Sequence, residues 1–101
     1  NLARVDSPKG FIIESLPDPP PIFPLIERTG PVAPEEMYRV YNMGIGFCVV
    51  VSPEGAARVQ EIARAAGCEA WRIGYCVPDP DKRVWIKPAA LVGQNGRFSS
   101  E

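Results

Sequence analysis

The sequence predicts an α/β (α+β) fold in which a mixed sheet packs against helices. Three patterns support this prediction: an unbroken apolar run at residues 47–51, an amphipathic helical pattern at residues 53–66, and alternating apolar residues between 70 and 77. A strand, a helix and a strand in that order, followed by a hairpin, indicate a sheet that mixes strand directions and is covered by helices.

The first forty residues are expected to form loops and short elements. Prolines crowd residues 6–21, where they remove backbone donors, so only a short strand at 11–14 is predicted there. A helix is predicted from Ile22 to Arg28, with Gly30 ending it. A second helix is predicted from Pro34 to about Tyr41, because proline suits the first helical position and two glutamates follow it.

The remaining elements should supply most of the sheet. The run at 47–51 is predicted to be a central strand covered on both faces. A helix over 53–66 and a strand at 70–77 follow. The turn at 78–81 is then predicted to lead into a last strand at 83–87, so that these two strands pair as a hairpin.

Composition excludes several functional classes. Apolar residues make up 46% of the 101 residues, charged residues 23%, and the net charge is −1, which is typical of a soluble globular domain. Acidic and basic residues are mixed along the chain, so neither nucleic acid nor a membrane surface is an expected partner. No apolar stretch approaches the roughly 20 residues that span a bilayer. We expect a cytoplasmic protein, because reducing cytosol best fits the cysteines described next.

The three cysteines are expected to be structural. Cys48, Cys68 and Cys76 are odd in number, have no metal-ligand spacing, and lie in or beside apolar segments. Buried thiols in a reducing compartment are therefore predicted, with no disulfide and no metal site. The sequence contains no histidine that could activate a thiol or act as a general base, and no catalytic residue can be assigned from it.

The chain ends carry two further expectations. Residue 1 is not methionine and no signal-peptide pattern follows it, which indicates a piece of a longer protein. Residues 91–101 are polar and rich in glycine, and we expect them to form a flexible tail.

The bend predicted between the second helix and the first long strand is the most informative segment. Gly44 and Gly46 leave the main chain bare, so the amides of 44–46 could face an anion or ligand, with Asn42 adding a polar side chain. Arg39, one turn earlier, could reach a phosphate. The alternative is that Asn42 caps the helix and the glycines only permit a tight turn. The residues alone leave both interpretations open.

Residues 36–47, with the sequence Glu-Met-Tyr-Arg-Val-Tyr-Asn-Met-Gly-Ile-Gly-Phe, closely resemble the signature of the aminoimidazole ribonucleotide synthetase family. Residues 1–5, 20–23 and 70–74 resemble other segments of that family, in the same order and spacing. Tyr41 and Phe47 depart from the usual Phe and Met, a tryptophan expected before the prolines is missing, and nothing after Lys87 matches.

This resemblance implies a function and a place in a larger enzyme. The family closes formylglycinamidine ribonucleotide into aminoimidazole ribonucleotide in purine biosynthesis, using ATP and Mg²⁺ held mainly by an amino-terminal domain that also forms a homodimer. It implies that residues 1–90 are part of the carboxy-terminal domain, with a partly ferredoxin-like fold, and that the fragment alone is inactive. The implied substrate-binding residues are Asn42, Gly44, Gly46 and Arg39. Arg39 and Arg4 are candidate phosphate or acid partners; the alternative for Arg39 is a solvated helix face, and the expected role of Arg4 is a surface salt bridge. Met43 and Tyr38 are expected to lie in the core.

Two alternatives remain from the sequence. Other members of the same superfamily, of the selenophosphate synthetase, hydrogenase maturation and formylglycinamidine synthetase types, share the architecture, although the run at 36–47 favours the cyclo-ligase. A non-catalytic ligand-binding module with a ferredoxin-like fold is the alternative from another class.

Overall fold

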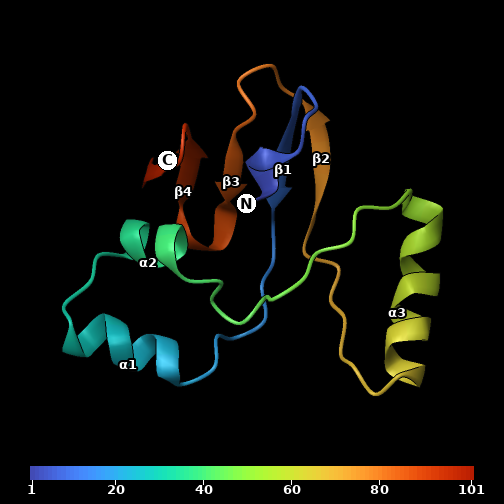
Figure 1. Ribbon diagram of the computed structural model, residues 1–101, viewed down its shortest axis with the longest axis horizontal. Helices are drawn as coiled ribbons and strands as arrows, with labels where there is room; N and C mark the ends of the chain where they lie inside the picture. Colours follow the sequence, from blue (N-terminus) through green and yellow to red (C-terminus); the bar gives the residue numbers. More distant parts are fainter.

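The computed structural model describes residues 1–101 and consists of one five-stranded mixed sheet with helices arranged around it (Figure 1). The predicted fold class is confirmed. The strands are β1 Lys9–Ile13, β2 Gly74–Pro78, β3 Val84–Ile86, β4 Leu91–Gln94 and β5 Arg97–Ser100. The α-helices are α1 Ile22–Thr29, α2 Pro34–Val40 and α3 Ala56–Ala65, and the 3-10 helices are η1 Leu2–Arg4, η2 Pro53–Gly55 and η3 Lys87–Ala89. No helix is long and apolar enough to span a membrane.

Strand β1 lies inside the sheet, between strands that come much later in the sequence. The order across the sheet is β2-β1-β3-β4-β5. β1 runs antiparallel to β2 and parallel to β3, whereas β3, β4 and β5 form an antiparallel meander. The two outer strands, β2 and β5, each have one unpaired edge.

The core lies on one face of this sheet. Its members are apolar side chains from β1, β3 and the start of β4: Phe11, Ile13, Val84, Ile86 and Leu91. Residues of η1, the loop after β1, and α2 pack over them, among them Leu2, Leu16 and Tyr38. Met37 of α2 is completely buried. Removal of this apolar surface from water is the main force that holds the sheet and α2 together.

The helices begin and end close to the predicted residues because their end signals are local. The N–H of Gly30 donates to the carbonyl of Ile26 at the end of α1, and Pro34 occupies the first position of α2. The helix predicted over 53–66 is present as η2 followed directly by α3. None of the residues in α3 is buried.

The prediction of a buried central strand at 47–51 is wrong. These residues form no strand, and Phe47 is 86% exposed and Val50 63% exposed. The composition of the run favours a strand, but both edges of β1 are already paired with β2 and β3. No interior place in the sheet remains for this segment.

The predicted hairpin between residues 70–77 and 83–87 is also wrong. Strands form at Gly74–Pro78 and Val84–Ile86, but β1 lies between them and pairs with both. Residues 79–83 therefore cross over β1 instead of joining two neighbouring strands. Asp79 holds this crossover, because its buried carboxylate accepts hydrogen bonds from the backbone N–H groups of Asp81 and Arg83 and from the Arg83 guanidinium.

Two smaller expectations also fail. Residues 91–101 are not a flexible tail: β4 and β5 form a hairpin around Asn95 and Gly96, Leu91 is only 2% exposed, and Lys87 pairs with Glu101. The cysteines are exposed, not buried. Cys48 lies in the unpaired 47–51 segment and Cys76 on the edge strand β2, so their exposure follows from the arrangement of the strands.

Candidate functional site

The bend after α2 is a tight turn stabilised by Asn42. The Asn42 carbonyl accepts a hydrogen bond from the Ile45 N–H at 3.0 Å, and its side-chain Oδ1 accepts one from the Gly44 N–H at 2.8 Å. The two central residues, Met43 and Gly44, have φ values of 54° and 97°. Positive φ at both central positions is the pattern of a type I′ turn, which glycine accommodates without strain.

The turn is locked against the proline-rich segment that precedes α1. A Cβ added to Gly44 would lie 2.5 Å from Cδ of Pro20, so only glycine fits there. Nearby, the rings of Phe23 and Tyr41 meet edge to face with centroids 6.0 Å apart. The two segments that carried the family resemblance, residues 20–23 and 36–47, are therefore in contact.

Several hydrogen-bond donors of the bend have no partner within the chain, and two of them belong to Asn42 and Gly46, which the family resemblance implied as substrate-binding residues. The amides of residues 44 and 45 are used by the turn, but the N–H of Gly46 and the side-chain NH₂ of Asn42 donate to no protein atom. Neither residue is buried, and a Cβ added to Gly46 would meet nothing within 4 Å. Each interpretation left open by the sequence therefore describes part of the bend: Asn42 and Gly44 build the turn, and Gly46 leaves an open amide.

Arg39 lies apart from this donor pair. Its guanidinium binds both carboxylate oxygens of Glu36, at 2.9 and 2.6 Å. This pairing lowers the pKa of the Glu36 carboxyl. Arg39 lines an open pocket of about 470 Å³ between α2 and the β4–β5 turn, together with Glu35, Glu36, Asn95, Gly96, Arg97 and Phe98. The structure therefore does not bring Arg39 to the side chain of Asn42 or to Gly46.

The remaining residues weighed from the sequence have structural contacts. Arg4 is exposed at the end of η1, where its Nη1 donates to Asn1 Oδ1 at 3.4 Å. Met43 is buried, and Tyr38 is half-buried against the core. Burial, with a smaller contribution from Glu27, raises the pKa of the Tyr38 hydroxyl above its ordinary value.

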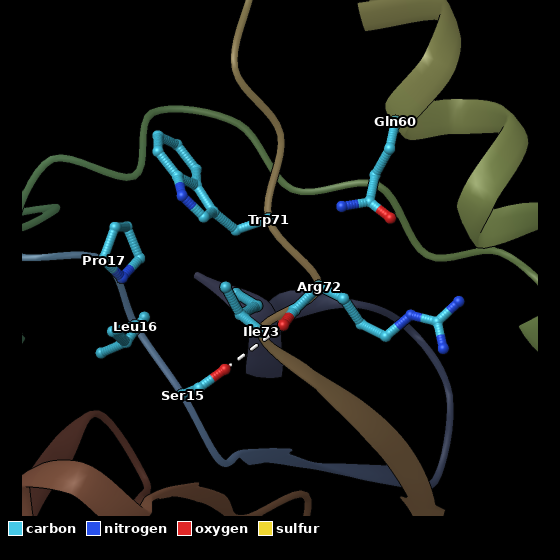
Figure 2. A pocket seen from close by; sticks show the side chains of 7 residues that line it. All are labelled: Ser15, Leu16, Pro17, Gln60, Trp71, Arg72 and Ile73. Atoms are coloured by element: carbon cyan, nitrogen blue, oxygen red, sulfur yellow. Dashed lines mark hydrogen bonds between the residues drawn. The ribbon is translucent and has the colours of Figure 1, made fainter. Parts of the chain in front are cut away.

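A second pocket, of about 220 Å³, was not predicted from the sequence. Figure 2 shows it between the loop after β1, α3 and the segment before β2. Its lining residues are Ser15, Leu16, Pro17, Gln60, Trp71, Arg72 and Ile73. The Ser15 hydroxyl donates to the Arg72 carbonyl at 3.3 Å, while Arg72 Nη2 donates to the Pro53 carbonyl at 3.5 Å. The feature of the sequence that could have indicated this pocket is the pair Trp71 and Arg72, an aromatic residue next to a cationic one.

The chain has no metal-binding group of its own. No three His, Cys, Asp or Glu side chains converge on one point. Asp79, whose pKa falls to about 2 mainly through its hydrogen bonds from the Arg83 side chain, is engaged in the crossover after β2 and not in a cleft. The bend at residues 42–46 has free hydrogen-bond donors, but no pair of side chains that could act as general acid and base lies beside it.

Comparison with known proteins identifies the family. The family described as AIR synthase related protein, C-terminal domain, matches residues 1–87. The phosphoribosylformylglycinamidine cyclo-ligase of Methanococcus vannielii is 45% identical over 97 residues, which is 95% of this chain and 28% of that protein. The protein of the same name from Methanocaldococcus jannaschii is 46% identical over 75% of this chain and 22% of its own length.

A bacterial relative gives the same result. The phosphoribosylformylglycinamidine cyclo-ligase of Enterococcus faecalis is 46% identical over 69 residues, or 68% of this chain and 19% of that protein. No solved structure matches the chain. The chain thus spans between 19% and 28% of the length of these three relatives. Since the family match covers residues 1–87, the chain belongs to the family of AIR synthase related C-terminal domains.

Proposed function

We propose that this chain is part of the carboxy-terminal domain of an ATP-dependent cyclo-ligase that converts formylglycinamidine ribonucleotide to aminoimidazole ribonucleotide in purine biosynthesis. The observation that carries the proposal is the 45% identity to the Methanococcus vannielii cyclo-ligase over 95% of the chain. The domain comprises residues 1–90, and the parent is a cytoplasmic homodimer with an amino-terminal ATP-binding domain.

In this proposal ATP and Mg²⁺ bind to other parts of the parent protein, mainly to its amino-terminal domain. The chain lacks a cluster of acidic ligands for a metal ion and has no Gly-Lys-Ser/Thr phosphate loop. No residue of this chain is therefore assigned to ATP or Mg²⁺. The fragment alone has no catalytic activity.

The role of the bend in this proposal is to hold the substrate. Asn42 Nδ2 and the Gly46 amide present N–H donors from a turn that Pro20 and the two Asn42 carbonyl groups make rigid. A donor fixed in place loses little conformational entropy when it binds an acceptor oxygen. The substrate carries such oxygens on its formyl and phosphate groups. Gly44 contributes by keeping the turn, and Arg39 contributes once a ligand phosphate replaces Glu36.

A chimera tests the proposal. The matching segment of the Methanococcus vannielii cyclo-ligase is replaced by residues 1–87 of this chain, and ATP-dependent formation of aminoimidazole ribonucleotide is measured. We expect turnover within roughly tenfold of the parent enzyme, which is about 1.4 kcal/mol in the barrier. A chimera that folds and binds ATP but forms no product contradicts the proposal.

A further inference from the structure

The pocket between α2 and the β4–β5 turn has a wall that lies outside the family match. The match ends at residue 87, whereas one wall of the pocket consists of residues 95–98. The opposite wall is α2, which lies against β5 beside the end of the sheet (Figure 1). The volume of about 470 Å³ is within the roughly 300–1,000 Å³ typical of small-ligand sites, and the other pocket, of about 220 Å³, is below that range.

The charges in this pocket leave one free anion and one free cation. Glu36 is neutralised by Arg39, whose guanidinium binds both of its carboxylate oxygens. Glu35 and Arg97 take part in no ion pair and no side-chain hydrogen bond within the chain. Glu35 is half-buried on α2, and Arg97 is exposed at the start of β5. A ligand that satisfies both side chains carries an anionic group at one end and an N–H donor at the other.

The tip of the β4–β5 hairpin adds two donors on the side of Arg97. Asn95 and Gly96 have φ values of 54° and 78°, and their backbone N–H groups donate to no protein atom. Successive open amides in a turn form an anion-binding site. A phosphate monoester, with three terminal oxygens and a charge near −2, matches these amides and a guanidinium better than a carboxylate with two oxygens and a single charge.

Glu35 and Phe98 define the chemistry of the other end of the ligand. An ionised carboxylate only accepts hydrogen bonds, so Glu35 requires an N–H donor. Phe98 is the one apolar residue of the lining, and its ring is held over Gly93, where an added Cβ would lie 2.6 Å from it. The flat face of a nucleobase stacks on such a ring, and an amino group on that base supplies the N–H.

We propose that this pocket binds a nucleoside monophosphate whose base carries an amino group. The phosphate accepts hydrogen bonds from Arg97 and the two hairpin amides, and the base lies on Phe98 with its amino group donating to Glu35. The ion pair on α2 stays closed and forms part of the wall. This site goes beyond the proposed enzymatic function and does not depend on it.

Amide chemical shifts of the whole chain test the proposal. Adenosine 5′-monophosphate is titrated into one isotope-labelled sample, and ribose 5-phosphate, which has the phosphate but no base, into a second. We expect saturable shifts at the amides of Asn95, Gly96 and Phe98 with both compounds, and an affinity for ribose 5-phosphate roughly tenfold lower. Equal affinities overturn the proposal, because it requires the base, and so does the absence of shifts at these amides.

Matched substitutions identify the groups that bind. Arg97→Ala should lower both affinities at least about tenfold, since the phosphate loses its guanidinium partner. Arg58→Ala removes the same charge from α3, outside the pocket, and should change neither affinity. Equal losses in these two variants would mean that phosphate follows net charge alone, which overturns the proposal. Glu35→Ala should reduce the preference for adenosine 5′-monophosphate over ribose 5-phosphate, and an unchanged preference contradicts the proposal.

Competition separates this site from that of the proposed enzyme. Formylglycinamidine ribonucleotide has no aromatic base to stack on Phe98, so at equal concentration it should displace little of the bound adenosine 5′-monophosphate from the hairpin amides. Full displacement overturns the proposal, because the pocket would then belong to the substrate site. An inactive chimera would reject the proposed enzymatic function and leave these titrations unaffected.

Discussion

Strand β1 and the apolar segment 47–51 have similar chemistry and opposite environments. Phe11 of β1 is 6% exposed, whereas Phe47 of the apolar segment is 86% exposed. Each segment contains one phenylalanine followed by small or branched apolar residues. The difference between them is pairing: β1 has β2 on one side and β3 on the other, and the apolar segment has no neighbour.

The preference of a segment for a strand and its burial are separate properties, and composition alone does not distinguish them. Apolar, β-branched residues set the preference for a strand, but burial follows from which strands are available to pair and which helix covers the face. The first region, β1–β5 with α2, has both strands that pair with one another and a helix that covers the core face. The second region, residues 47–66, has neither, since 47–51 pairs with no strand and no residue of α3 is buried.

The largest expected effect lies in the first region. Leu91→Ala removes a side chain that is 2% exposed and should lower the free energy of unfolding by about 2–5 kcal/mol. Ile62→Ala, in the second region, should cost no more than about 1 kcal/mol, because only the contacts of α3 are at stake. Urea denaturation followed by tryptophan fluorescence measures both. Equal losses would mean that the two regions are packed alike.

Gly74→Ala should have the next largest effect. A Cβ at this position would overlap the carbonyl oxygen of Ile12 across the β1–β2 pair, and the strands must separate to accept it. We expect a loss of about 1–3 kcal/mol in the free energy of unfolding. The urea midpoint is again the measurement, and an unchanged midpoint would show that β2 is not held closely against β1.

Gly44→Ala should destabilise the chain less. It places a Cβ on a residue with φ of 97° and against Pro20, at a cost of about 1–2 kcal/mol. The matched variant is Gly46→Ala, where φ is not positive and no atom is close, so stability should stay unchanged. If both variants shift the urea midpoint equally, the turn does not have the geometry described.

The smallest effect is on pH dependence. Arg83 holds the pKa of the Asp79 carboxyl at about 2, below its ordinary value in an unfolded chain. The ionised carboxylate therefore stabilises the fold above about pH 4, and this contribution is lost as the pH falls towards 2. The urea midpoint should decline over this range, and less steeply in Asp79→Asn. An identical decline in the two proteins would assign the acid sensitivity to other groups.

The helices could be predicted from the sequence because their ends depend on nearby residues. Pro34 begins α2 and Gly30 follows α1, whatever the rest of the chain does. The β4–β5 hairpin carries a local signal too, since Asn95 and Gly96 adopt the positive φ values of a two-residue hairpin turn. The polar residues around this pair conceal the signal, because they favour a flexible tail over a strand.

The pairing of strands could not be predicted in the same way. Whether β2 meets β3 or β1 depends on residues more than sixty positions apart, and the local pattern of each strand is the same in both cases. The candidate site shows a similar division. The turn at Asn42 and Gly44 follows from their residue types, whereas the pairing of Arg39 with Glu36 and the contact with Pro20 depend on geometry.

The central claim is that the bend after α2 presents open donors to the substrate of a cyclo-ligase. Gly46→Ala in the chimeric enzyme tests it most directly, because the substitution leaves the chain's own packing untouched and adds a methyl group where the substrate would approach. We predict a fall in kcat/KM of roughly tenfold or more, with an unchanged urea midpoint. An unchanged kcat/KM in a folded, active chimera would show that the bend is remote from the substrate.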